Sequence, residues 1–142
     1  MDNRIKVGDI HIIGLTDGIA TFNPRILFPN TPLEAWEPYY DIFPECFDGK
    51  FFRTNLGSFA ISTKDKVIVA DTGLGPHGDM FGFPAPGRLL GDFESNEISL
   101  ESVNTVFITH LHGDHYGWNY REDTEERKPT FPNAEYVVHT KD

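Results

Sequence analysis

The sequence predicts an α/β sandwich, and three observations favour this fold class. Apolar or β-branched runs alternate with short helical segments along most of the 142 residues. Two runs, Val67–Ala70 and Thr105–Thr109, have the composition of strands buried on both faces of a sheet. Each leads directly into a residue able to carry chemistry, Asp71 and His110, as strand ends in α/β folds often do. The length favours one domain covering residues 1–142.

The N-terminal part is expected to hold a strand or hairpin and then a long, ordered loop. Ile5–Thr16 is rich in β-branched residues, and Asp17-Gly18 is a typical turn pair that would close it. Thr21–Lys50 contains five prolines and many aromatic residues. Within it, Thr31-Pro32-Leu33-Glu34 has the form of a capping box, which predicts one short helix that begins at this proline and ends near Pro38.

The rest of the chain is expected to alternate strands with short helices and loops. The expected strands are Phe51–Thr63, Val67–Ala70, Thr105–Thr109 and Glu135–His139, with Lys64-Asp65-Lys66 as the turn between the first two. A helix is expected over Arg88–Ser95, and Ser99 could cap one further turn through Val103. Loops are expected over Gly73–Gly87 and Tyr116–Pro132.

Charge and composition exclude several classes of function. The net charge of −10 disfavours nucleic acid as a partner, because an acidic surface repels a phosphate backbone. No apolar run reaches the roughly 18 residues that a membrane span needs, and the first ten residues do not resemble a secretory signal. Cys46 is the single cysteine, so no internal disulfide is expected. These features favour a cytoplasmic protein.

The most informative motif is the run His110-Leu111-His112-Gly113-Asp114-His115. In an extended segment, residues two apart point to the same side, so His110 and His112 can reach one ion together. Gly113 permits a sharp turn that brings Asp114 and His115 to a neighbouring position. Imidazole and carboxylate suit Zn²⁺, Mn²⁺ or Fe²⁺, and two such ions can hold a hydroxide between them and polarise the bond that it attacks. The alternative is a polar loop with unrelated histidines.

These residues carry a family resemblance. The run Thr109 to His115 resembles the signature of the metallo-β-lactamase superfamily. Asp71-Thr72-Gly73 at the end of the earlier strand resembles the first motif of that family, and Arg88–Thr109 its helix, turn and strand before the metal site. The aromatic N-terminal segment looks more like the branch of the quorum-quenching lactonases and methyl parathion hydrolase. The resemblance implies an αββα sandwich, of which this chain would form mainly the first half.

The resemblance also implies a role for each residue of the motif. His110 and His112 would bind a first metal ion, and Asp114 and His115 a second. Asp114 would in addition transfer the proton during turnover. Asp71 would orient a ligand histidine, since a ligating imidazole needs its other N–H anchored; the alternative is a simple turn residue at the strand end. The implied cofactors are two divalent ions, zinc before iron(II) or manganese(II).

The sequence departs from the family pattern after the motif. That pattern continues with a further His, a bridging Asp and a last His, yet only 27 residues follow His115 in the 142-residue chain. Two hydrolytic ions would need about eight ligands from protein and solvent, and the motif supplies four. The other histidines are His11, His77 and His139. His139 is expected to be a strand residue and His77 a solvated loop residue.

A half-domain would leave one face of its sheet uncovered, which predicts a large exposed apolar patch. Three explanations are open: the chain is a fragment of a protein about twice as long, a second chain supplies a complementing C-terminal half, or two copies form a homo-oligomer. The fragment explanation is favoured.

The leading functional hypothesis is a metal-dependent hydrolase of small molecules, in which metal-bound hydroxide attacks an ester, lactone or phosphoester. Two alternatives are a catalytically silent half-domain that binds a metal or a partner, and a thioesterase of the glyoxalase II type. A substrate entrance or a dimer contact could be lined by the aromatic residues in and after the proline-rich segment Thr21–Lys50, which are Trp36, Tyr39, Tyr40, Phe43, Phe47, Phe51 and Phe52. Packing of these aromatic residues under a long loop is slightly favoured over both uses.

Overall fold

The computed structural model describes residues 3–76, 87–121 and 126–142. It divides into two compact units, one formed by Met1–Gly18 with Leu56–Asp142 and the other by Ile19–Asn55. Each unit is described by itself below. His77 lies outside the described residues, as does most of the expected loop Gly73–Gly87.

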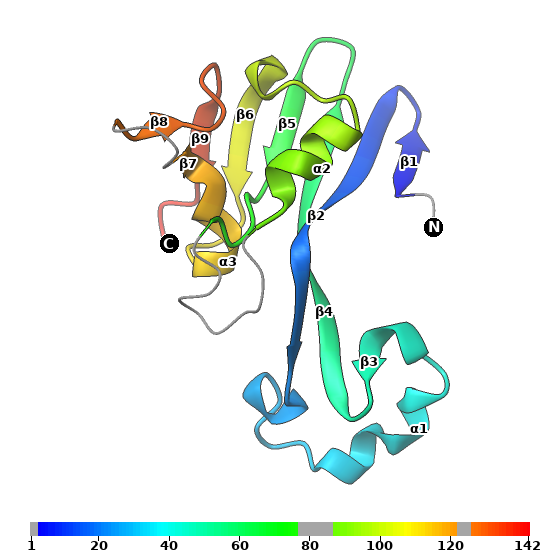
Figure 1. Cartoon of the computed structure of the whole chain (residues 1–142). Helices are drawn as coiled ribbons and strands as arrows, with labels where there is room; N and C mark the ends of the chain where they lie inside the picture. The colour runs from blue at the N-terminus through cyan, green and yellow to red at the C-terminus, as the bar shows by residue number, and fades with distance from the viewer. Residues whose placement is uncertain (1–2, 77–86, 122–125) are drawn as a thin grey trace. The chain divides into compact units, whose positions relative to one another are not determined.

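A mixed β-sheet organises the chain (Figure 1). Within the described residues it has seven strands, in the order β1-β2-β4-β5-β6-β9 with β3 paired to β4. β1 and β2 are antiparallel, as are β4 and β5, whereas β5, β6 and β9 run parallel. Their bounds are Arg4–Val7 (β1), Ile10–Phe22 (β2), Phe47–Asp48 (β3), Phe51–Ser62 (β4), Val67–Ala70 (β5), Val103–Ile108 (β6) and Glu135–Val138 (β9). β7 (Tyr120–Arg121) and β8 (Lys128–Pro129) form a separate pair.

The helices are short. In the larger unit they are α2 (Leu89–Ser95), η5 (Leu100–Ser102), α3 (Gly113–Tyr116) and η6 (Gly117–Asn119). α2 and η5 lie where the sequence predicts them, although Ser99 makes no side-chain capping bond to η5. None of the described helices is long and apolar enough to cross a membrane.

The N-terminal hairpin differs from the expectation. β1 and β2 pair from Arg4 with Ile13 to Val7 with Ile10, so the turn lies at residues 8–9 and not at Asp17-Gly18. Asp17 instead lies inside β2, with its side chain 2% exposed. The prediction was wrong because this carboxylate is held by backbone N–H groups from distant segments, which a local turn pattern does not reveal.

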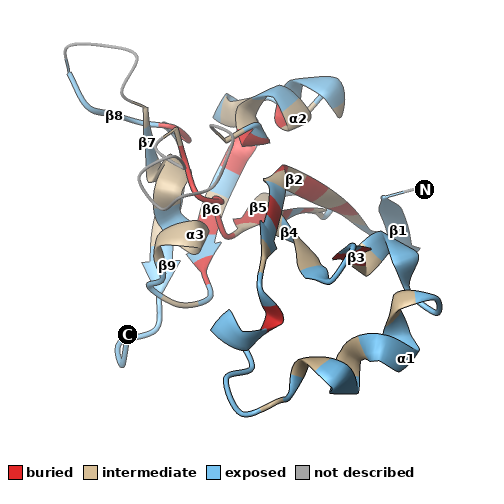
Figure 2. Ribbon diagram, turned by 60° about the horizontal axis from the view of Figure 1, so that its bottom comes forward, coloured by how far each residue is buried: buried red, intermediate tan, exposed pale blue. Residues whose placement is uncertain are grey.

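The predicted strands over residues 51–63, 67–70 and 135–139 are confirmed to within one residue, with His139 just beyond the end of β9 and not inside it. The strand expected over Thr105–Thr109 is β6, which begins earlier, at Val103, and ends at Ile108. The expectation that β5 and β6 are buried on both faces was wrong. On one face of the sheet, the neighbouring strands β4, β5 and β6 pair Ala60 with Val69 and Val69 with Val106, and all three residues are 0% exposed. On the other face it joins Phe59, Ala70, Phe107 and Val137, and here Phe59 is 52% and Phe107 43% exposed. Figure 2 shows this mixture of buried and exposed positions along β6.

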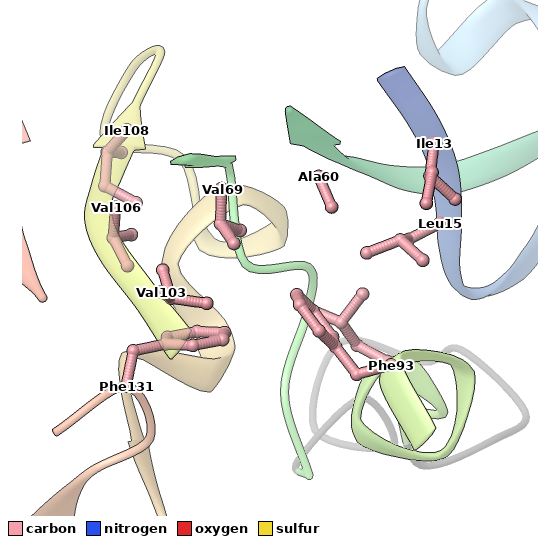
Figure 3. Packing of buried hydrophobic residues seen from close by; sticks show 10 residues of the cluster. Ile13, Leu15, Ala60, Val69, Phe93, Val103, Val106, Ile108 and Phe131 are labelled. Carbon is pink, nitrogen blue, oxygen red and sulfur yellow. The ribbon is translucent and has the colours of Figure 1, made fainter. Parts of the chain in front are cut away.

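The core of the larger unit lies on the buried face of the sheet. Leu89 and Phe93 of α2, both 0% exposed, pack against this face together with Phe131. The rings of Phe93 and Phe131 are 5.4 Å apart between centroids. Figure 3 shows these side chains gathered between the strands and α2. Burying a residue of this size stabilises the fold by about 1.5–3 kcal/mol, so the α2 contact is a main determinant of the fold.

The smaller unit contains nine of the chain's 19 aromatic residues. Its elements, besides the ends of β2 and β4, are β3 and the short helices η1 (Pro24–Ile26), η2 (Leu33–Trp36), α1 (Glu37–Tyr40) and η3 (Pro44–Cys46). The helical segment begins beside Pro32 and ends at Tyr40, close to Pro38, as expected, although Pro38 itself lies in the first turn of α1. Proline is tolerated there because the first N–H groups of a helix have no intrahelical acceptor.

The aromatic side chains of this unit pack mainly on one another. The Trp36 ring lies 5.1 Å from Phe28 and 6.2 Å from Phe52, and Tyr40 lies 4.9 Å from Phe47, all between ring centroids. Such pairs add about 0.5–1.5 kcal/mol each beyond area burial. The unit therefore has its own small core, which is the packing role that the sequence slightly favours.

Candidate metal centre

The motif residues converge at one edge of the sheet. β5 and β6 are parallel neighbours, so their C-terminal ends lie at the same edge. Asp71 follows β5 directly, and His110 follows β6 after Thr109. A hydrogen bond of 2.9 Å from the Asp71 backbone N–H to the carbonyl of Phe107 holds the two strand ends together. Parallel pairing thus joins two segments that are far apart in the sequence.

Asp71 occupies a backbone conformation that few non-glycine residues adopt. Its φ is 61°, in the left-handed region that Asp and Asn tolerate better than most residues. The side chain is 11% exposed and accepts three hydrogen bonds of 2.8 Å. Oδ1 accepts from the backbone N–H of Thr109, and Oδ2 accepts from the Thr109 hydroxyl and from Nδ1 of His115. The strained turn therefore places one carboxylate against both ends of the motif.

His110 and His112 lie together as a pair of nitrogen donors. Nε2 of His110 is 3.1 Å from Nδ1 of His112, and the ring centroids are 4.4 Å apart. His112 is extended (φ −92°, ψ 150°), which turns its ring to the same side as that of His110. Two imidazole nitrogens on one tetrahedral zinc ion would be about 3.3 Å apart, given Zn–N bonds of about 2.0–2.1 Å. The observed spacing fits two ligands of one ion.

Asp114 and His115 form the second pair. Both lie in α3, a single turn that starts after His112 and is closed by a 3.0 Å hydrogen bond from the His115 N–H to the His112 carbonyl. Nε2 of His115 is 3.4 Å from Oδ2 of Asp114, while the opposite ring nitrogen faces Asp71. The His110 and His115 rings lie 3.9 Å apart between centroids, so the two donor pairs are adjacent.

The donor set is incomplete for two ions. No group of three or more His, Cys, Asp or Glu side chains is arranged to hold a metal ion in the part of the chain that the structure describes. Each pair offers two donors, and a tetrahedral ion needs four from protein and solvent together. Of the other histidines, His11 lies in β2, and His139 follows β9 and accepts a 3.2 Å hydrogen bond from the Lys141 N–H.

The loop after Asp71 is hydrogen-bonded to α3 and to the residue that follows it. The Thr72 N–H donates to the His115 carbonyl at 2.7 Å, and the Gly117 N–H donates to the Gly73 carbonyl at 2.8 Å. The Thr72 hydroxyl donates to Oδ1 of Asn119 at 2.9 Å. Gly117 must be glycine for steric reasons, because a Cβ there would overlap the backbone of Leu74. Close backbone contact therefore fixes the position of α3.

Asp17 anchors the same region, a role that no local sequence pattern predicts. Its Oδ2 accepts from the N–H groups of Leu74 (2.6 Å) and Gly75 (3.0 Å), and its Oδ1 from Leu89 (2.8 Å) and from Nε1 of Trp118 (2.8 Å). This buried carboxylate joins β2 to the loop after β5, to the start of α2 and to the segment after α3. Only the tertiary structure identifies it.

Thr109 is the second residue that sequence reasoning left without a role. Its hydroxyl lies 2.8 Å from Asp71 and 3.1 Å from Nδ1 of His110. Its position directly before His110 at the end of a strand is the one signal in the sequence that could have identified it.

The chain belongs to the metallo-beta-lactamase superfamily, whose sequence profile matches residues 58–142. The matched segment contains Asp71 and the whole motif from Thr109 to His115. The mixed sheet with its flanking helices is therefore the α/β fold of that superfamily, as the sequence predicts. No curated protein sequence matches the chain.

Solved structures agree with this assignment. A hydrolase of the beta-lactamase superfamily, AbOPH, is 26% identical, with a TM-score of 0.75 over 94% of this chain. AidC, a dizinc quorum-quenching lactonase in complex with a product, is also 26% identical, with a TM-score of 0.74 over 94% of this chain. A probable metal-dependent hydrolase from Staphylococcus aureus is 21% identical and shares the fold, with a TM-score of 0.78 over 96% of this chain.

The chain spans less than half of these structures. It covers 42% of the AbOPH chain, 42% of the AidC chain and 49% of the staphylococcal protein.

Proposed function

We propose that this chain is the metal-binding half of a hydrolase domain that acts on esters, lactones or phosphoesters of small molecules. The single observation that carries the proposal is the adjacency of two donor pairs, His110 with His112 and Asp114 with His115, in the segment that follows β6. In this proposal the first pair holds one divalent ion and the second pair holds another, with zinc favoured for both.

Asp71 and Asp114 would have different roles in this reaction. Divalent ions, when bound, would polarise the scissile bond and acidify the attacking water. Asp71 keeps His115 oriented through Nδ1 and leaves Nε2 for the ion. Asp114, with its side chain 42% exposed, is accessible enough to pass a proton to the leaving group.

The substrate class is proposed from the related structures and from charge. AidC is a lactonase and AbOPH a hydrolase, and each is 26% identical to this chain. The net charge of −10 disfavours polyanionic substrates such as nucleic acids. A small ester or lactone, or a phosphoester without a long anionic chain, fits both observations.

A complementing C-terminal half is the partner that we expect to cover the open face of the sheet. The row of Phe59, Ala70, Phe107 and Val137 is apolar across four strands, and its two phenylalanines are 52% and 43% exposed. Such a half, within the same polypeptide or as a separate one, would also supply the missing ligands. A homo-oligomer formed through this face is the second possibility, and sedimentation of the chain alone distinguishes it from a monomer.

Two alternatives remain within reach of experiment. A silent half-domain would bind metal without turnover, and a thioesterase of the glyoxalase II type would prefer thioester substrates. Because the described residues would offer two donors to each ion, metal binding and turnover have to be measured separately.

The test is metal titration of the metal-free chain against a chromogenic chelator, with His110→Ala and Asp114→Ala as variants and His139→Ala as the matched control. The expected result is zinc binding that His110→Ala and Asp114→Ala each weaken by about tenfold or more, while His139→Ala leaves it unchanged. Hydrolysis of a homoserine lactone, an aryl ester, an aryl phosphotriester and a thioester then assigns the reaction. Metal binding with no turnover of any substrate supports the silent half-domain, and absence of metal binding contradicts the proposed site.

A further inference from the structure

We infer that Thr109 is a positioning residue that fixes the tautomer of His110 and so leaves its Nε2 free to bind a metal ion. The inference rests on the proposed function, because it takes His110 to be a ligand. It adds a residue that is not among the proposed ligands, and it assigns that residue a measurable effect on a single ring nitrogen.

The argument is a count of protons around the Thr109 hydroxyl. A hydroxyl has one proton to donate, and a carboxylate can only accept. The 2.8 Å contact between Oγ1 of Thr109 and Oδ2 of Asp71 therefore uses the hydroxyl proton. Oγ1 then has only lone pairs left for Nδ1 of His110, which lies 3.1 Å away. The proton in that contact has to come from His110, so the Nδ1 of His110 carries it.

A competing contact does not change this count. Nδ1 of His115 also approaches the Thr109 hydroxyl, at 3.5 Å, but lies only 2.8 Å from Oδ2 of Asp71. The proton of His115 is therefore directed to the carboxylate, which is the nearer and stronger acceptor. The lone pair of Thr109 stays available to His110.

The consequence reaches both donor pairs. With Nδ1 protonated, a neutral His110 ring has a bare Nε2, which faces Nδ1 of His112 at 3.1 Å. In the metal-free chain His112 fills this contact by donating from Nδ1, and a metal ion would replace that proton between the two rings. Asp71 thus sets the tautomer of His115 directly and that of His110 through Thr109.

Three variants separate this role from a merely structural one. Thr109→Val removes the hydroxyl but keeps the branched shape and the backbone N–H that donates to Oδ1 of Asp71. Thr109→Ser keeps the hydroxyl and should restore the wild-type behaviour. Thr105→Val removes a hydroxyl from the same strand, β6, and serves as the matched control.

The primary measurement is the tautomer of His110 in the metal-free chain of residues 1–142, read from long-range ¹H–¹⁵N correlations of its imidazole ring by NMR. The expected result is a protonated Nδ1 and a bare Nε2 in the wild type, in Thr109→Ser and in Thr105→Val. In Thr109→Val the tautomers should mix. Zinc affinity, measured by chelator competition, should fall about tenfold in Thr109→Val and by less than about twofold in the other two variants.

A wild-type His110 with the proton on Nε2 would overturn the inference, whatever the variants do. A Thr109→Val protein with an unmixed His110 tautomer and wild-type zinc affinity would overturn it as well. Both outcomes are distinct from failure of the proposed function, which appears as a wild-type chain that binds no zinc. In that case the NMR spectrum of the metal-free chain still decides the role of Thr109.

Discussion

His115 donates a hydrogen bond of 2.8 Å from Nδ1 to Oδ2 of Asp71, across 44 residues of sequence. The bond joins the segment after β6 to the residue that follows β5. It also decides which ring nitrogen of His115 points outward, since Nε2 is left 3.4 Å from Asp114. One contact between two strand ends therefore prepares the second donor pair before any ion is present.

The first prediction concerns this bond. Asp71→Asn keeps a side chain that tolerates the φ of 61°, but its amide has a single acceptor oxygen where the carboxylate has two. We expect zinc affinity to fall by roughly 10–100-fold without loss of a binding site, because the histidine ligands remain. Chelator competition gives the affinity, and elemental analysis gives the stoichiometry.

Asp114→Asn is the contrasting variant for this experiment. Replacing a proposed ligand should remove one ion per chain, whereas Asp71→Asn should only weaken the binding. Equal stoichiometry and equal affinity in Asp71→Asn and the wild type would contradict the orienting role of Asp71.

The second prediction concerns the buried carboxylate of Asp17. Each of its oxygens accepts two N–H donors, so the NH₂ group of Asp17→Asn must face two donors that it cannot satisfy. We expect the free energy of unfolding to fall by about 2–5 kcal/mol, since each buried donor left unpaired costs about 1–3 kcal/mol. Urea denaturation measures the change. The exposed Asp65 of the β4–β5 turn is the control, and a loss as small as that of Asp65→Asn would contradict the anchoring role.

The third prediction compares two glycines. A Cβ at Gly117 would overlap the backbone of Leu74. Because this overlap involves backbone atoms, it cannot be relieved by rotating a side chain, so Gly117→Ala should destabilise the fold by about 2 kcal/mol or more. A Cβ at Gly91, in α2, meets no atom within 4 Å, so Gly91→Ala should stabilise it by about 0.5–1 kcal/mol. Thermal unfolding of the two variants side by side should show midpoints shifted in opposite directions. Shifts in the same direction would disprove the steric argument.

The fourth prediction is a dependence of stability on pH from Tyr136. Burial raises the pKa of this phenol above its usual value of 10.0, and the hydrogen bond from the Phe131 N–H partly opposes the rise. A raised pKa in the folded state means that the unfolded chain releases the proton first. The stabilisation is therefore complete below about pH 10 and is lost as the pH rises through the folded-state pKa.

Tyr136→Phe tests this sign. The variant loses the phenol that donates to the Asn119 carbonyl at 3.2 Å, so it should be less stable than the wild type at neutral pH by about 1 kcal/mol. The difference should shrink above pH 10 as the wild-type phenol ionises. Urea midpoints at pH 7 to 11 provide the measurement, with Tyr116→Phe, at an exposed tyrosine, as the control. A difference that grows with pH would contradict the prediction.

Local sequence patterns determined most of the strands and the identity of the donor residues. The apolar runs before Asp71 and His110 predict β5 and β6, and the helix over residues 88–95 is α2 almost to the residue. The motif from His110 to His115 gives the donor types because their spacing is local. Extended backbone and one glycine suffice to bring four side chains with metal-binding donor atoms within reach of each other.

The tertiary structure decided what local patterns could not. Asp17-Gly18 looks like a turn. The N–H groups that hold Asp17 inside β2, however, belong to Leu74 and Leu89, which lie 57 and 72 positions further along the chain. β5 and β6 look buried on both faces, yet α2 covers only one, since a strand's own composition does not say what packs against it.

The hydrogen bond of the Thr109 hydroxyl also depends on both the sequence and the tertiary structure. The sequence places a hydroxyl beside His110, but the direction of its hydrogen bond depends on Asp71, which only the pairing of β5 with β6 brings within 2.8 Å. The sequence by itself determined which side chains could bind a metal ion. The fold decided how those side chains are oriented, because orientation depends on contacts between segments that are distant in the chain.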